Sequence, residues 1–126
     1  MRMAAADDAQ KVRALMERYV QAVYVADVDT LRDLFHADAF MGGYLGDDLL
    51  MGTPEPFFAD LASRASMADS GAPYGHEISS VQVQGRAATA TIEEEGFFGS
   101  VRFINYFTLI ELEGQWKIAS KTFASL

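Results

Sequence analysis

The second half of the chain alternates between apolar and polar residues, and this period of two constrains the fold more than any other feature. The alternation begins after Pro73, and the turn signals that interrupt it are Gln84-Gly85-Arg86, Gly96 to Ser100, and Glu113-Gly114-Gln115. It predicts four long strands, which contain in turn Ile78 to Val83, AATATIEEE, VRFINYFTLIELE and QWKIASKTF. Because the connections are short, successive strands are expected to pair antiparallel.

Before Pro73 the apolar residues recur with the period of an α-helix. One amphipathic helix is expected to begin at Asp7 or Asp8, either of which can cap it, and its apolar stripe is Val12, Leu15, Met16, Tyr19, Val20 and Val23. A second helix is expected from Asp29, as its cap, to Phe35, and a third from Thr53-Pro54-Glu55 to a point before Asp69. Between them, Gly46-Asp47-Asp48 separates two apolar runs and predicts a hairpin. Helices first and strands last indicate an α+β fold with the helices on one face of the sheet.

Length and composition fit one folded domain. The 126 residues are enough for one hydrophobic core and too few for two, so residues 1–126 are predicted to form a single domain, with residues 1–6 flexible. The absence of cysteine excludes disulfides, thiolate catalysis and cysteine-ligated metals. A net charge of −8 with scattered basic residues disfavours nucleic acid and anionic membranes as partners. With no signal-like or membrane-spanning apolar run, a cytoplasmic location is expected.

Several segments resemble the nuclear transport factor 2-like superfamily. Its closing strands are similar to Tyr106-Phe107-Thr108-Leu109-Ile110, to Glu113-Gly114-Gln115-Trp116-Lys117-Ile118 and to Ser120-Lys121-Thr122-Phe123, and its second helix and following turn resemble VDTLRDLFHADAF. Its middle is similar to the strand of Ala88, Ala90 and Ile92. The nearest branch is the one named putative lumazine-binding, close to the SnoaL-like and ketosteroid-isomerase-like groups.

This resemblance implies a cone, in which a curved antiparallel sheet is wrapped by the N-terminal helices around a cavity. We expect that cavity between the first helix and the strands around Ile92 and Asn105. In the superfamily the outer face of the sheet commonly pairs with a second copy, so a homodimer is expected.

Strand alternation selects the first candidate residues for the cavity. Ala88, Ala90, Ile92 and Glu94 share one face of their strand. If that face is concave, Glu94 points into the cavity and can act as a general base or acid. The alternative, which its acidic neighbours favour, is a solvated strand end. By the same alternation Lys121 is expected to face away from the cavity, opposite Trp116 and Ile118.

On the next strand one face carries Phe103, Asn105, Phe107 and Leu109. Asn105 can orient a ligand through hydrogen bonds but cannot take its proton, because an amide is not a base. The aromatic side chains of this face, Phe103 and Phe107, are predicted to contact a ligand.

The remaining candidates come from the helices and turns. His76 can titrate near neutral pH, although an exposed position at the start of a strand is favoured. Asp48 is a candidate base, but its position beside Asp47 is more typical of a turn. Tyr19, Tyr24 and Tyr44 can donate a hydrogen bond to a developing oxyanion, as tyrosines do in the superfamily's isomerases, while a core role is favoured for tyrosines at helical spacing. No histidine spacing suits a metal, so neither a metal nor a cofactor is expected.

Two functions of different classes follow. One is a small-molecule binding protein that holds an apolar or heteroaromatic compound against Tyr19, Tyr44, Phe103, Asn105 and Phe107. The other is a cofactor-free isomerase, dehydratase or cyclase that uses Glu94, His76 or an aspartate between residues 38 and 48, such as Asp48, as its base and a tyrosine or Asn105 as hydrogen-bond donor. A third possibility is a dimeric accessory module with a vestigial cavity. The sequence does not distinguish an enzyme from a binding protein.

Overall fold

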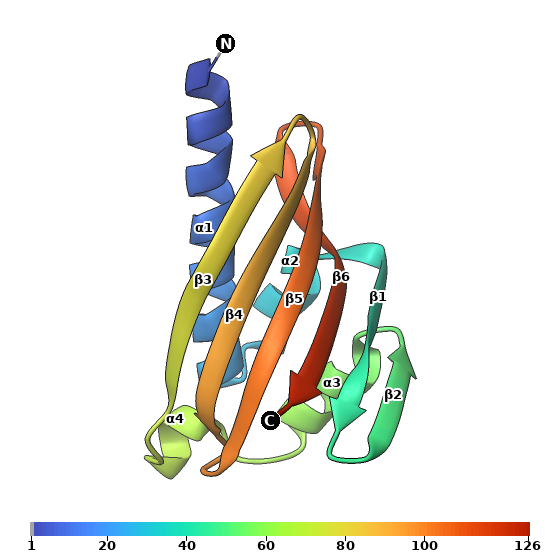
Figure 1. Cartoon of the computed structure of the whole chain (residues 1–126). Coiled ribbons are helices and arrows are strands. Elements are labelled where there is room, and N and C mark those ends of the chain that lie inside the picture. Colours follow the sequence, from blue (N-terminus) through green and yellow to red (C-terminus); the bar gives the residue numbers. More distant parts are fainter. Residues whose placement is uncertain (1) are drawn as a thin grey trace.

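A computed structural model describes the backbone of residues 2–126 and the side chains of residues 6–126. Within residues 2–126, four helices and six strands follow one another (Figure 1): α1 (Arg2–Val25), α2 (Val28–Leu34), β1 (Phe35–Leu45), β2 (Asp48–Gly52), α3 (Glu55–Ala62), α4 (Met67–Ser70), β3 (Gly75–Gln84), β4 (Ala87–Phe97), β5 (Val101–Leu112) and β6 (Gln115–Ser125). Of the residues 1–6 that the sequence suggests are flexible, Met1 lies outside the described residues, and the backbone from Arg2 onward is helical.

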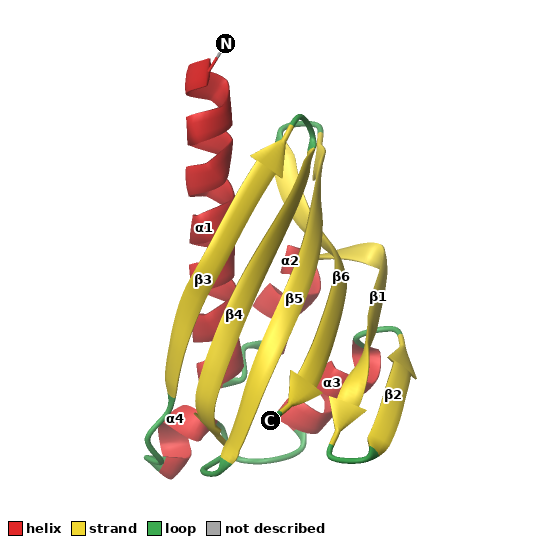
Figure 2. Ribbon diagram, in the orientation of Figure 1, coloured by secondary structure: helices red, strands yellow, loops and turns green. Residues whose placement is uncertain are grey.

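The six strands form one curved sheet in the order β2-β1-β6-β5-β4-β3, with the helices on one side of it (Figure 2). Strands β3 to β6 form the predicted antiparallel meander. The predicted hairpin joins β1 to β2. One pair departs from the expected antiparallel pattern, because β1 and β6 run parallel. The chain reaches β1 from the helices rather than through a hairpin, so its direction is not tied to that of β6.

The core lies between α1 and the concave face of the sheet. The apolar stripe predicted for the first helix is buried along its whole length, from Val12 to Val23. It packs on the inward faces of β4 and β5, where Tyr19 meets Phe107 edge to face with 5.0 Å between ring centroids. Such aromatic pairs add about 1 kcal/mol to the burial of the rings themselves.

Two helix boundaries differ from those expected. The cap of α2 is Asp27 rather than Asp29, because Asp27 Oδ1 accepts a hydrogen bond from the backbone N–H of Thr30 at 3.2 Å. The expected third helix is divided into α3 and α4. Ser66 is the N-cap of α4, because its side chain accepts a hydrogen bond from the backbone N–H of Asp69 at 3.0 Å.

A β-bulge in β6 reverses the expected orientation of Lys121. Ile118 and Ser120 pair with consecutive residues of β5, which leaves Ala119 without a partner. One extra residue shifts the alternation by one position, so Ile118, Lys121 and Phe123 are all buried on the concave face. The prediction that Lys121 faces away from the cavity is therefore wrong.

Candidate ligand pocket

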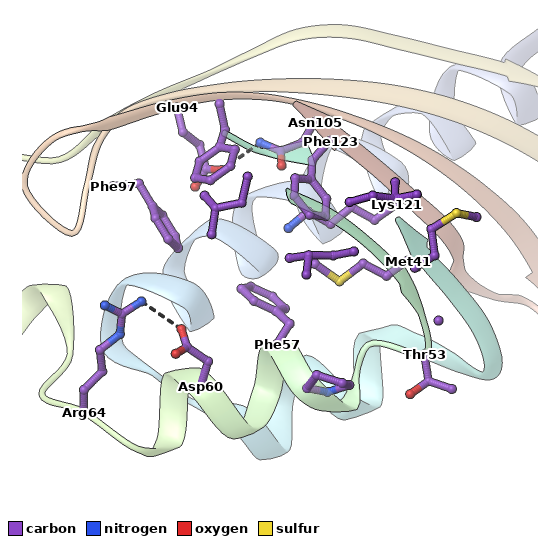
Figure 3. Close-up of a pocket in the computed structure, with 17 residues that line it drawn as sticks. Met41, Thr53, Phe57, Asp60, Arg64, Glu94, Phe97, Asn105, Lys121 and Phe123 are labelled. Atoms are coloured by element: carbon purple, nitrogen blue, oxygen red, sulfur yellow. Dashed lines mark hydrogen bonds and ion pairs between the residues drawn. The ribbon is translucent and has the colours of Figure 1, made fainter. Parts of the chain in front are cut away.

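A pocket of about 430 Å³ opens between α3, the β1–β2 hairpin and the ends of β4, β5 and β6 (Figure 3). Most of its wall is apolar: Met41, Leu45, Leu49, Leu50, Met51, Pro56, Phe57, Phe97, Phe103 and Phe123. The polar and charged lining residues are Thr53, Asp60, Arg64, Glu94, Asn105 and Lys121. A concave site of this volume, apolar with a few polar groups, is typical of small-molecule binding.

The pocket is not where the sequence suggests. No described residue of α1 lines it, because the apolar stripe of that helix is buried against the sheet. Helix α3 forms the facing wall instead and contributes Phe57, Asp60 and the nearby Arg64 (Figure 3). The expected boundary at the first helix is therefore wrong, while the boundaries at the strands of Ile92 and Asn105 agree with the structure, since both β4 and β5 contribute lining residues.

Three of the candidate residues lie together in the pocket wall: Glu94, Phe103 and Asn105. Glu94 is only 3% exposed. The solvated strand end favoured by its acidic neighbours is therefore wrong, and the inward orientation is the observed one.

Five other candidates lie outside the pocket wall. Tyr19 and Phe107 belong to the core behind it. Tyr44 is 51% exposed on β1, and Asp48 is exposed at the start of β2. His76 lies at the start of β3, where its Nε2 is 3.6 Å from a carboxylate oxygen of Glu17. Two of them nevertheless lie near Glu94: His76 pairs with it across β3 and β4, and the charge of Glu94, after burial, raises the pKa of Tyr19. The roles of all five toward a ligand stay predictions.

Glu94 is held in place by two hydrogen-bond donors. Asn105 donates from Nδ2 to Glu94 Oε1 at 2.7 Å and also to the backbone oxygen of Ile92 at 3.2 Å. Tyr74 donates its hydroxyl hydrogen to Glu94 Oε2 at 2.5 Å. Burial, together with the negative charge and hydrogen bond of Glu94, raises the pKa of Tyr74 far above its ordinary range, so the phenol stays a donor. The carboxylate thus has a fixed position in the wall.

Sequence reasoning missed Tyr74 as part of this arrangement. It lies in the loop just before β3, where no periodic pattern shows the direction of its side chain. Its ring stacks on that of Tyr24 with 5.7 Å between centroids, which orients the hydroxyl toward Glu94. Only the tertiary contact identifies it.

Lys121 is the second residue whose position the sequence did not show. It is 5% exposed, and its Nζ lies 4.3 Å from the ring centroid of Phe57 and 5.3 Å from that of Phe123. Burial lowers the pKa of Lys121 to about 8, and the nearby charge of Glu94 offsets only part of this effect. Its ammonium group makes no hydrogen bond to a described residue and has no described carboxylate oxygen within 4.0 Å.

The remaining charged lining residues form a pair on α3 and the turn after it. Arg64 contacts Asp60 with 2.8 Å between Nη2 and Oδ2. The guanidinium also lies over the ring of Phe98, at 3.5 Å from its centroid. Both side chains are about half exposed, so the ion pair itself contributes little to stability.

Two kinds of feature are not found in the part of the chain that the structure describes. No group of three or more His, Asp or Glu side chains there is placed to hold a metal ion. No helix in residues 2–126 combines the length and apolar character needed to cross a membrane.

Comparison with known proteins agrees with this architecture. Residues 7–124 match a family described as putative lumazine-binding. No curated protein matches the sequence. Among solved structures, a nuclear transport factor 2-like protein of unknown function from Silicibacter pomeroyi is 29% identical with a TM-score of 0.84, over 96% of this chain and 98% of the other.

Two further solved structures show the same fold at lower identity. One is a nuclear transport factor 2-like protein of unknown function from Methylobacillus flagellatus, with 24% identity and a TM-score of 0.85 over 95% of this chain and 93% of the other. The other is a ketosteroid isomerase-like protein from Erwinia carotovora atroseptica, with 17% identity and a TM-score of 0.71 over 94% and 96%. At these identities the likeness describes the fold alone.

Proposed function

We propose that this chain, which belongs to the putative lumazine-binding family of the nuclear transport factor 2-like superfamily, binds a small apolar or heteroaromatic molecule in its pocket. The observation that carries the proposal is a cavity of about 430 Å³ with a mostly apolar wall and a cluster of polar groups on the sheet side. That combination favours a ligand with an apolar body and one polar end.

The aromatic part of the wall suits a planar body. Phe97 and Phe103 meet edge to face at 5.2 Å, and Phe103 meets Phe123 in the same way at 5.9 Å. These rings present both faces and edges to the pocket, the two surfaces against which an aromatic ligand packs. A ligand that buries roughly 200 Å² of apolar area would gain about 5 kcal/mol before the cost of association.

A neutral fluorescent dye tests this function. N-phenyl-1-naphthylamine brightens on entering an apolar site, and we expect saturable binding of one dye per chain. Leu50→Arg should abolish the binding, since Leu50 lines the pocket and is 48% exposed. Val25→Arg is the matched control, because Val25 is 41% exposed at the end of α1 and does not line the pocket. Absence of saturable binding, or equal loss in both variants, would refute the proposal.

A second candidate function is proton transfer by a cofactor-free isomerase, dehydratase or cyclase. The observation that favours it is the buried carboxylate of Glu94 in the same pocket wall as the cation of Lys121. A fixed carboxylate can take a proton beside a carbonyl, and a nearby cation can stabilise the enolate that forms.

Deuterium exchange tests this second function. The α-protons of 2-tetralone in D₂O would exchange faster with the protein than without it, and Glu94→Gln should remove the acceleration while dye binding persists. If wild-type protein binds 2-tetralone but does not accelerate exchange, Glu94 is not a base toward this class of ketone.

We also propose that the outer face of the sheet forms a homodimer. Its support is the apolar surface of β5, where Tyr106 and Ile110 are exposed in the single chain. Light scattering after size exclusion is expected to give twice the chain mass for the wild type and the mass of one chain for Ile110→Glu. A wild-type monomer at micromolar concentration would contradict this.

A further inference from the structure

The side chain of Lys121 is buried, but its ammonium group is accessible from the pocket and makes no hydrogen bond to a described residue. It lines the pocket and is 5% exposed, and its nearest described neighbours include the faces of three aromatic rings, those of Tyr19, Phe57 and Phe123. A lysine ammonium carries three hydrogen-bond donors. Removing such a group from bulk water without an acceptor is unfavourable, so we expect the ammonium group to bind an acceptor in the pocket.

Neither carboxylate in the pocket wall supplies that partner. Glu94 accepts hydrogen bonds from Asn105 and Tyr74, and its oxygens lie more than 4.0 Å from Lys121 Nζ. Asp60 is paired with Arg64 at 2.8 Å. No carboxylate of the described chain is within 4.0 Å of Lys121 Nζ. The acceptor must therefore come from the pocket itself, as water or as a bound molecule that displaces it.

The surroundings favour an acceptor that carries a negative charge. The faces of the three rings attract a cation but accept no strong hydrogen bond. A neutral carbonyl would satisfy one donor and leave the charge uncompensated in an apolar wall. An ionised oxygen supplies both the acceptor and the opposite charge, and such charge-assisted bonds are roughly twice as strong as neutral ones.

We propose that the ligand of this pocket is an organic acid, with a planar apolar body and a carboxylate, phenolate or enolate oxygen that binds Lys121 Nζ. This inference rests on the proposed binding function and specifies the chemical class of its ligand. In Figure 3 the Lys121 side chain extends toward Phe57 and Phe123. A ligand anchored there by its acid group places its body against the phenylalanines and the β1–β2 hairpin.

Two probes of nearly equal shape separate the contribution of ligand charge to affinity from the contribution of ligand shape. Biphenyl-4-carboxylate and biphenyl-4-carboxamide have the same apolar body, and only the first is an anion. By isothermal titration at pH 7, the wild type is expected to bind the carboxylate about tenfold more tightly than the amide, as a charge-assisted bond implies. Lys121→Met should lose about tenfold in carboxylate affinity and less than about twofold in amide affinity.

Lys117→Met is the matched control on the same strand. Lys117 does not line the pocket, and its Nζ bonds to the backbone oxygen of Asp33 at 2.6 Å. This variant is expected to bind both probes like the wild type. Equal affinity of the wild type for the two probes, or parallel loss of both in Lys121→Met, would overturn the proposal. If the dye N-phenyl-1-naphthylamine still binds in that case, the acid class fails while the binding function stands.

The pH dependence of carboxylate affinity is an independent test of Lys121 as the anchor. With the pKa of Lys121 at about 8, carboxylate affinity should fall about tenfold between pH 7 and pH 9 as the ammonium loses its proton. The other titratable or charged groups facing this region are Tyr19 on α1, Glu94 on β4, and the Asp60 and Arg64 pair. Burial raises the pKa of Tyr19, so that phenol keeps its proton in this range. Unchanged carboxylate affinity from pH 7 to pH 9 would count against Lys121 as the anchor.

Discussion

Replacing Lys121 by methionine should stabilise the empty protein at neutral pH. Burial lowers the pKa of Lys121 from 10.5 to about 8, so the folded state resists the charge that the unfolded state carries freely. A folded pKa below the unfolded one means that the unfolded chain binds more protons between these values, and stability therefore rises with pH across this window. At about 1.4 kcal/mol per pH unit, the penalty below pH 8 amounts to about 3 kcal/mol.

Methionine removes that penalty without opening a cavity. Its unbranched side chain has a length close to that of lysine, and its sulfur packs well against aromatic rings. Loss of the contacts between the cation and the rings offsets part of the gain. The expected increase in the free energy of unfolding at pH 7 is therefore about 1 to 3 kcal/mol. A lysine that costs stability in the empty protein is the kind of residue a binding site retains.

Urea unfolding at pH 7 and at pH 9.5 measures this effect. Between these values the stability of the wild type should rise by about 2 kcal/mol relative to Lys121→Met, as the pKa of about 8 implies. Tyr19 and Tyr74 are present in both proteins, so their contributions cancel in the comparison. A variant less stable than the wild type at pH 7, or one with the same pH dependence, would refute the assignment of Lys121 as a buried, unpaired cation.

Four further substitutions test local features through the free energy of unfolding, measured by chemical denaturation. Gly96→Ala should lower the free energy of unfolding by more than about 2 kcal/mol, since a Cβ at this positive-φ position would overlap the backbone oxygen of Pro73. Gly85→Ala should lower it by only about 1 kcal/mol, because Gly85 also has a positive φ but its surroundings are open. Equal losses of stability in the two variants would contradict the steric reason. Asp27→Ala should cost about 1 kcal/mol through loss of the α2 cap, and no change would show that the cap is dispensable. Tyr74→Phe should cost about 1 to 2 kcal/mol by leaving a pocket carboxylate oxygen without its donor, and an unchanged stability would argue against that hydrogen bond.

The elements that the sequence predicts well are those with one buried face. The stripe from Val12 to Val23 and the alternation from Ala88 to Ile92 repeat with the period of their own secondary structure, because one face of each is buried. The same patterns place Phe103 and Asn105 on the inward face of β5. These positions follow from local regularity, which a single sequence displays.

The features that were missed depend on contacts between distant parts of the chain. Glu94 lies between two other glutamates, and this local sequence predicts a solvated side chain. In the fold its hydrogen-bond donors are Asn105 and Tyr74, which are distant in sequence. Lys121 turns inward because of the bulge at Ala119, and alanine carries no sequence signal for a bulge. The charged half of the pocket was therefore not predictable from periodicity.

A crystal structure of the protein with biphenyl-4-carboxylate bound is the most direct test of the acid-binding pocket. We expect one molecule between α3 and the β1–β2 hairpin, with a carboxylate oxygen about 2.8 Å from Lys121 Nζ. The biphenyl body should lie against Phe57, Phe103 and Phe123. A carboxylate bound instead to Arg64, or left in solvent with Lys121 still unpaired, would contradict the proposal.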